Sequence, residues 1–170
     1  EVHKKEYDAA AHHILARRIA AESAVLLKND GMLPLKKENS YAVIGAFAET
    51  PRYQGAGSSR IHPHQIDCVL DSLRESGIAF EYAPGYELEQ DTINPVLLEE
   101  AAACAKGRDG ILVFAGLPDS YESEGFDRTH LNLPKSHTAL IEAVTAVNPH
   151  VTVVLLCGSA ILMPWRDRVE

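Results

Sequence analysis

The feature that most constrains this fold is a regular alternation of helical and strand-like segments along the chain. Three short apolar runs have the length and composition of buried strands, at residues 41–48, 111–115 and 151–157, and a fourth run at 78–82 alternates in part, as a strand at a sheet edge does. Segments with helical spacing or capping residues alternate with these runs, at residues 8–28, 64–76, 95–106 and 136–147. The alternation predicts an α/β fold, a three-layer α/β/α sandwich around a mostly parallel, flavodoxin-like sheet.

The predicted strand order brings two unusual loops together. In a flavodoxin-like order the first strand neighbours the third, and the winding of the sheet reverses between them. The loops that follow these two strands then flank one crevice at the carboxyl edge, where such sheets bind ligands. One of these loops is glycine-rich (residues 55–60) and the other is acidic (residues 116–128). We therefore expect these loops to lie side by side and to form the functional site.

The glycine-rich loop suits a sugar or a carboxylate better than a phosphate. It lacks the GxGxxG spacing, no lysine follows it, and Pro63 interrupts the turn into the next helix. Its small residues permit close approach, and Ser58, Ser59 and Arg60 offer hydroxyl and guanidinium donors for a substrate. The alternative is that its two glycines only satisfy turns with positive φ.

The acidic loop holds the candidates for chemistry. Asp127 and Arg128 are expected to pair with each other and to fix the base of the loop. Glu122 and Glu124 are the candidate catalytic residues, since crowded carboxylates raise one another's pKa and a protonated glutamate is a general acid. Two residues apart in an extended segment, they should point to opposite sides. The alternative is a solvated acidic loop without chemistry.

Other reactive residue types form no recognisable site. His62 and His64 have no histidine or cysteine at complementary spacing, so no metal site is predicted, and no motif indicates a cofactor. The three cysteines include no CxxC pair and read as buried free thiols. Ser159 follows the last strand as a nucleophile would, but it lacks the GxSxG elbow and is expected to cap a helix.

Composition excludes some partners. A formal charge of −8 and a pI near 5.5 argue against a nucleic-acid or anionic-membrane surface. No stretch approaches the roughly 20 apolar residues of a membrane span. The charged N-terminal residues show no signal peptide, which leads us to expect a cytoplasmic location. At 170 residues the chain suits one domain, and it breaks off where another βα unit would start.

Several segments resemble the C-terminal sandwich domain of family 3 glycoside hydrolases. They occur in the family's order and cover most of the chain, at residues 13–17, 22–29, 33–35, 55–60, 122–128 and 131–134. The resemblance implies that residues 1–170 are such a domain, excised from a larger enzyme and truncated at its C-terminal end.

The resemblance also implies an activity, retaining hydrolysis of a β-glucoside or related oligosaccharide. Retaining enzymes use a nucleophile and an acid/base carboxyl group. In the family the nucleophile is an aspartate on a preceding (β/α)8 barrel, and this domain supplies the acid/base glutamate. Counted back from Asp127, that position falls best on Glu122, whereas members with a shorter Gly-Glu-Gly loop favour Glu124. Ser59 and Arg60 would line the same crevice, and the chain alone should hydrolyse nothing.

Two other functions are consistent with the same sequence. The chain could be a stand-alone flavodoxin-like domain that binds a nucleotide or a sugar without catalysis. It could also be a purely structural domain whose loops serve as an interface.

Overall fold

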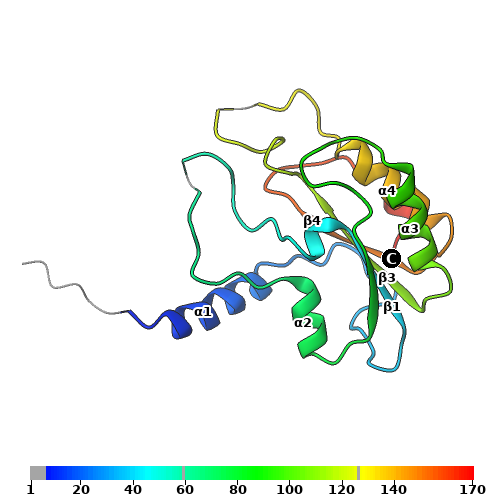
Figure 1. Cartoon of the computed structure of the whole chain (residues 1–170), viewed down its shortest axis with the longest axis horizontal. Coiled ribbons are helices and arrows are strands. Elements are labelled where there is room, and N and C mark those ends of the chain that lie inside the picture. The colour runs from blue at the N-terminus through cyan, green and yellow to red at the C-terminus, as the bar shows by residue number, and fades with distance from the viewer. Residues whose placement is uncertain (1–6, 59, 126) are drawn as a thin grey trace, which may run out of the picture.

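The computed structural model describes residues 7–58, 60–125 and 127–170 and contains a sheet of four parallel strands (Figure 1). The strands are β1 (Tyr41–Ile44), β2 (Phe80–Ala83), β3 (Gly110–Gly116) and β4 (Val151–Leu156). Their order across the sheet is β2-β1-β3-β4. The first strand lies beside the third, which confirms the α/β class and the flavodoxin-like order.

Helices cover the two faces of this sheet. The helices of the described chain are α1 (Ala9–Glu22), which projects away from the sheet, α2 (Val69–Glu75), α3 (Pro95–Ala105) and α4 (Lys135–Thr145), with short 3-10 turns η1 (Ala46–Ala48) and η2 (Arg166–Arg168). Helices α3 and α4 pack together on one face, and α2 lies on the other (Figure 1). Helix α3 begins where the sequence predicts, because Asn94 accepts a hydrogen bond from the N–H of Val96 at 3.1 Å. In the described ranges, no helix combines the length and the apolar character needed to span a bilayer.

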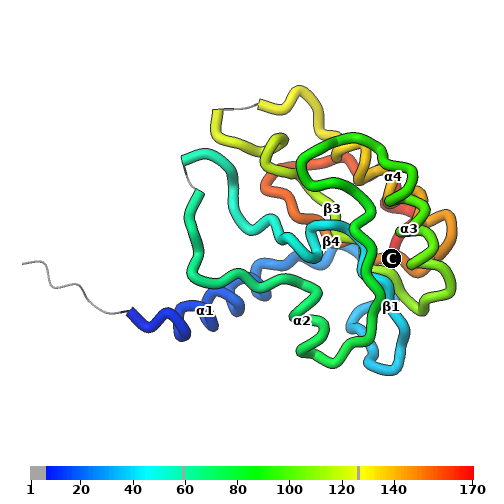
Figure 2. The backbone as a smooth tube through the Cα atoms, in the orientation of Figure 1, coloured from blue at the N-terminus to red at the C-terminus, as the bar shows by residue number. Residues whose placement is uncertain are grey.

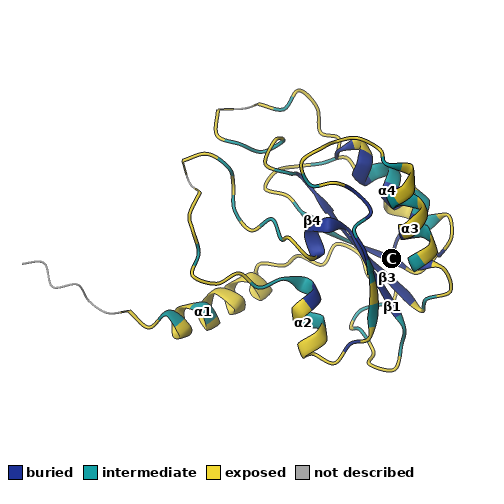
Figure 3. Ribbon diagram, in the orientation of Figure 1, coloured by how far each residue is buried: buried dark blue, intermediate teal, exposed yellow. Residues whose placement is uncertain are grey.

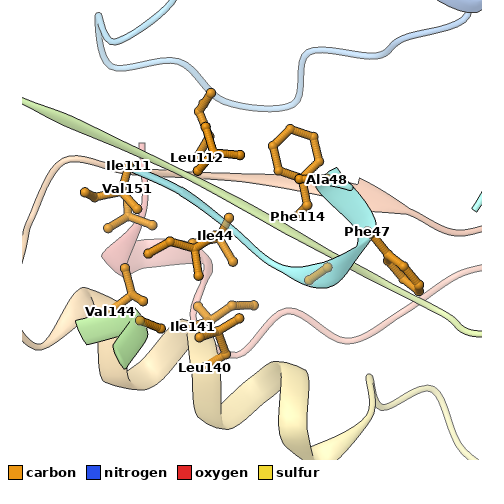
Figure 4. Close-up of a cluster of buried hydrophobic side chains, with 14 of the residues drawn as sticks. Ile44, Phe47, Ala48, Ile111, Leu112, Phe114, Leu140, Ile141, Val144 and Val151 are labelled. Carbon is orange, nitrogen blue, oxygen red and sulfur yellow. The ribbon is translucent and has the colours of Figure 1, made fainter. Parts of the chain in front are cut away.

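The core lies on both faces of the sheet, under α3 and α4 on one side and under α2 on the other, and strand β3 is buried along its whole length (Figure 3). Alternate residues of β3 point to opposite faces of the sheet (Figure 4). Ile111 points toward α4, where Leu140 and Val144 are fully buried, and Leu112 and Phe114 point to the other face. Because both faces are covered, the strand is a continuous apolar run, as its sequence predicts.

The first helix ends earlier than its apolar spacing predicts. Helix α1 stops at Glu22 rather than near Lys28, and the Ser23 hydroxyl there donates to the carbonyl of Ile19 at 2.7 Å. None of the residues of α1 is buried (Figure 3). Val25, beyond its end, is 78% exposed. Most helix stability in proteins comes from packing an apolar face. Because the apolar face of α1 is not packed, the helix ends at the first residue whose side chain bonds the backbone, Ser23.

Other boundaries also differ from the predicted ones. Strand β1 ends at Ile44 rather than near residue 48, because Gly45 has a φ of +116° that no strand contains. Helix α2 also begins later than its pattern predicts. Ser136 does not cap α4 but is buried within its first turn, where its N–H and hydroxyl donate to Asp91 at 2.9 and 3.1 Å.

Candidate active site

The glycine-rich loop after β1 and the acidic loop after β3 lie side by side at the carboxyl edge of the sheet (Figure 2). Ala56 and Ser123 form an isolated parallel bridge, and the N–H of Glu124 donates to the carbonyl of Ala56 at 3.5 Å. Gly57 comes so near that an added Cβ would lie 2.6 Å from the Cβ of Glu124. The juxtaposition predicted from the strand order is confirmed.

A cavity of about 630 Å³ opens between these loops. Its walls come from the glycine-rich loop, the acidic loop and the loop after β4, and they include Ser58, Glu122, Glu124, Arg128 and Ser159. The two glutamates turn their carboxylates to different neighbours. Glu122 faces the loop after β4 and Glu124 faces the glycine-rich loop, as their two-residue spacing predicts.

The carboxylate of Glu122 is held by three donors from two other loops. Arg52 Nη1 lies 2.9 Å from its Oε2, and the N–H of Gly158 donates to the same oxygen at 2.9 Å. The hydroxyl of Ser159 donates to Oε1. The side chain is 15% exposed. Glu122 is therefore a fixed, mostly buried anion rather than a freely moving group.

Arg128 fixes the base of the acidic loop, but not by pairing with its neighbour Asp127 as the sequence suggests. Its Nη2 donates to the hydroxyl of Ser159 at 2.7 Å and to the carbonyl of Ala160 at 2.9 Å. Asp127 is exposed and lines the cavity. Adjacent side chains on an extended segment point apart, so the guanidinium reaches the loop after β4 instead.

The pKa of Glu122 is lowered, contrary to the expectation that crowded carboxylates raise one another's pKa. Burial of the side chain raises the pKa, but hydrogen bonds from Ser159 and Gly158 and the charges of Arg52 and Arg128 outweigh burial. The expectation considered only the neighbouring carboxylates and not the positive charge of Arg52 and Arg128. Glu122 is therefore ionised at neutral pH.

Glu124 has a different environment. Its side chain is exposed, and both the N–H of Ser58 (2.8 Å) and the Ser58 hydroxyl donate to Oε2. These two bonds lower its pKa. No described residue pairs Glu124 with a cation or donates to its Oε1. This carboxylate is therefore oriented by one serine and is accessible from the cavity.

The three predicted binding residues of the glycine-rich loop separate in space. Ser58 lines the cavity next to Glu124, and Ser59 lies outside the described residues. Arg60 is exposed and lines a different cavity of about 750 Å³, together with Tyr53. The backbone bridge between the two loops contributes residues to both cavities. Arg60 thus belongs to a neighbouring surface rather than to the cavity that holds both glutamates.

Sequence reasoning missed the residues that hold Glu122. Ser159 was expected to cap a helix, yet no helix begins there and its hydroxyl contacts Glu122 and Arg128. A signal was available, because the loop after β4 must reach the same sheet edge in a parallel fold. Arg52 carries no such signal, since a single arginine in a long loop has no characteristic spacing.

Comparison with known proteins agrees with this architecture. The model of the glycosyl hydrolase family 3 C-terminal domain matches residues 24–170. The thermostable beta-glucosidase B of Acetivibrio thermocellus is 52% identical over 169 residues, which cover 97% of this chain and 22% of that protein. The exo-alpha-(1->6)-L-arabinopyranosidase of Bifidobacterium longum is 46% identical over 175 residues, covering 96% of this chain and 23% of that protein.

A solved structure has the same fold over the whole chain. The crystal structure of the Bifidobacterium adolescentis GH3 beta-glucosidase superposes with a TM-score of 0.93 at 42% identity. The match covers 99% of this chain and 25% of that protein. The chain thus spans about a quarter of the length of the relatives that it matches.

Proposed function

This chain belongs to the glycosyl hydrolase family 3 C-terminal domains, and from that premise we propose that it supplies the general acid/base glutamate of a retaining β-glycosidase. The nucleophile, an aspartate, would come from a (β/α)8 barrel elsewhere in the same protein. The substrate would be a β-glucoside or related oligosaccharide, held between the barrel and the cavity of about 630 Å³. Without the barrel this chain would be inactive.

The observation that carries this proposal is the contrast between the two glutamates, and it favours Glu124 as the acid/base. A general acid must reach the glycosidic oxygen and exchange its proton in each cycle. Glu122 has a carboxylate occupied by Arg52, Gly158 and Ser159, all of which stabilise its ionised form. Glu124 is exposed to the cavity and accepts hydrogen bonds from Ser58. Glu122 would then have a supporting role.

The acid form of Glu124 would be favoured in the full-length protein. A docked barrel and a bound sugar would exclude water from the cavity, and loss of water raises the pKa of a carboxyl group. A carboxyl group of raised pKa can protonate the leaving oxygen and then, as a carboxylate, take a proton from the attacking water. Ser58 would keep Oε2 oriented while Oε1 faces the substrate.

The test is Glu124→Gln in the full-length enzyme. Turnover of aryl β-glucosides with poor leaving groups should fall by about 10²–10⁴-fold, because their oxygen needs a proton, whereas activated aryl glucosides should lose much less. Added azide should accelerate the variant on activated substrates and yield glucosyl azide, since the anion can attack where the carboxylate has been removed.

Glu122→Gln is the matched variant. It keeps the Glu124 carboxylate, so azide should neither accelerate it nor yield glucosyl azide. Azide rescue of Glu122→Gln together with its absence in Glu124→Gln would move the acid/base role to Glu122. Absence of rescue in both variants would place the acid/base outside this chain.

A further inference from the structure

Three loops at the carboxyl edge converge on one set of polar contacts. Arg52 reaches Glu122 from the loop after β1, and Gly158 and Ser159 reach it from the loop after β4. Arg128 binds Ser159 and completes the set. We name these five residues the Glu122 clamp.

Ser159 is the central hydroxyl of this clamp. It accepts a hydrogen bond from Arg128 Nη2 at 2.7 Å and donates its own proton to Glu122 Oε1. A serine hydroxyl has one proton to donate and lone pairs to accept with, so both functions are in use. Ser159 therefore links the guanidinium of Arg128 to the carboxylate of Glu122.

The clamp acts two residues away from Glu124. Ser123, between the two glutamates, forms the backbone bridge with Ala56, and Glu124 itself contacts Gly57 and Ser58. In the segment from Glu122 to Glu124, the clamp therefore holds the Glu122 end and the glycine-rich loop holds the Glu124 end. Loosening the clamp would release the Glu122 end, while the glycine-rich loop would still hold Glu124.

We propose that Ser159, through the Glu122 clamp, is a positioning residue that sets where the acid/base Glu124 stands in the cavity. The inference rests on the proposed function of Glu124. Misplacement of a catalytic group by about 1 Å can cost 10²-fold in rate. The loss should be selective, because only leaving groups that need a proton depend on the position of the acid.

The fold should survive removal of the Ser159 hydroxyl. Glu122 would keep Arg52 and Gly158, and Arg128 would keep the carbonyl of Ala160. Each of these charged side chains would keep at least one described partner. The variant Ser159→Ala therefore tests position rather than folding, and Ser159→Cys offers a second variant of similar size with a weaker donor.

The experiment measures kcat/KM of the full-length enzyme on a series of aryl β-D-glucosides with graded leaving groups. Ser159→Ala should lose about tenfold or more on the poorest leaving group and less than about twofold on the most activated one. Ser159→Thr keeps the hydroxyl and should restore the wild-type profile, and Ser159→Cys should be intermediate. Ser40→Ala is the control, since Ser40 also donates to a carboxylate, that of Asp109 (2.7 Å), but at the amino edge.

A double variant separates the positioning role of Ser159 from the acid/base role of Glu124. In the Glu124→Gln background, Ser159→Ala should add no further dependence on the leaving group, because no acid remains to be positioned. If Glu124→Gln itself loses activity equally on all substrates, the proposed function fails. If Glu124→Gln is selective but Ser159→Ala is uniform, silent or additive with it, the positioning role is overturned and the acid/base assignment stands.

Discussion

The two edges of the sheet are built from different interactions. At the amino edge the buried side chain of Asn148 donates to the carbonyls of Ala105 and Arg108 at 3.0 and 2.9 Å. At the carboxyl edge long loops meet around Glu122 and leave a cavity beside Glu124. At the amino edge Asn148 thus satisfies backbone carbonyls, whereas at the carboxyl edge Arg52, Gly158 and Ser159 hold the Glu122 carboxylate beside the cavity.

The largest effect is expected where the strands of the carboxyl edge lie closest. A Cβ added to Gly116, at the end of β3, would lie 1.9 Å from the carbonyl oxygen of Leu156 in β4. Gly116→Ala should therefore force the strands apart and destabilise the chain by more than about 4 kcal/mol, as severe core clashes do. Urea unfolding of the full chain measures this loss.

The matched variant lies in the turn before β3, at the amino edge. Gly107 has a φ of +74° and an added Cβ there meets nothing within 4 Å. Gly107→Ala should cost only about 1–2 kcal/mol, the strain of a left-handed residue. Equal costs for the two variants would show that close strand contact does not distinguish the edges.

A smaller effect, confined to stability, is expected at Asn148. Asn148→Ala removes the hydrogen bonds that its amide donates to the carbonyls of Ala105 and Arg108 and the one that its oxygen accepts from the N–H of His150, so it should cost about 2–3 kcal/mol in urea unfolding. Asn94→Ala, which removes the cap of α3, is its counterpart at the carboxyl edge and should cost about 1 kcal/mol. Neither should change the leaving-group profile of the full-length enzyme. A changed profile in Asn148→Ala would mean that the edges are not independent.

The fold could be predicted because its signals are local. Strands β1, β3 and β4 are mostly apolar runs, β2 alternates in part around Glu81, and the cap Asn94 with Pro95 marks the start of α3 within two residues. The alternation of elements then leaves few topologies, and the observed order follows from the handedness of the connections. The contact between the glycine-rich and acidic loops follows in turn, since it requires only that β1 lies beside β3.

The inside of the site could not be predicted because its contacts join residues far apart in the chain. Arg52 and Ser159 keep Glu122 ionised. Because both residues come from other loops, the spacing of residues within the acidic loop does not indicate these contacts. The pairing of Asp127 with Arg128 was inferred from adjacency, and the guanidinium found a better partner in Ser159. The predicted end of helix α1 was wrong for a related reason. Apolar spacing predicts that one face of a helix is apolar, but it does not show whether another element packs on residues such as Val25.

The last prediction concerns pH and again separates the two edges. His137 is buried near the carboxyl end of β3, stacked 3.8 Å from the ring of Tyr86, and its Nδ1 accepts the N–H of Gly116 at 3.2 Å. Burial outweighs the nearby charge of Asp91 and lowers the pKa of His137 to about 4. The unfolded chain, with a pKa near 6.5, therefore binds this proton more readily.

Stability should consequently fall as the pH drops from about 6.5 toward 4, by about 2 kcal/mol between pH 7 and pH 5. His137→Gln keeps an acceptor for Gly116 but cannot be protonated, so its urea unfolding should depend less on pH over this range. His150→Gln at the amino edge, where His150 is exposed and contacts Glu170, serves as the matched variant. If His150→Gln flattens the profile and His137→Gln does not, acid sensitivity belongs to the amino edge. If His137→Gln alone flattens it, the acid sensitivity belongs to His137 at the carboxyl edge.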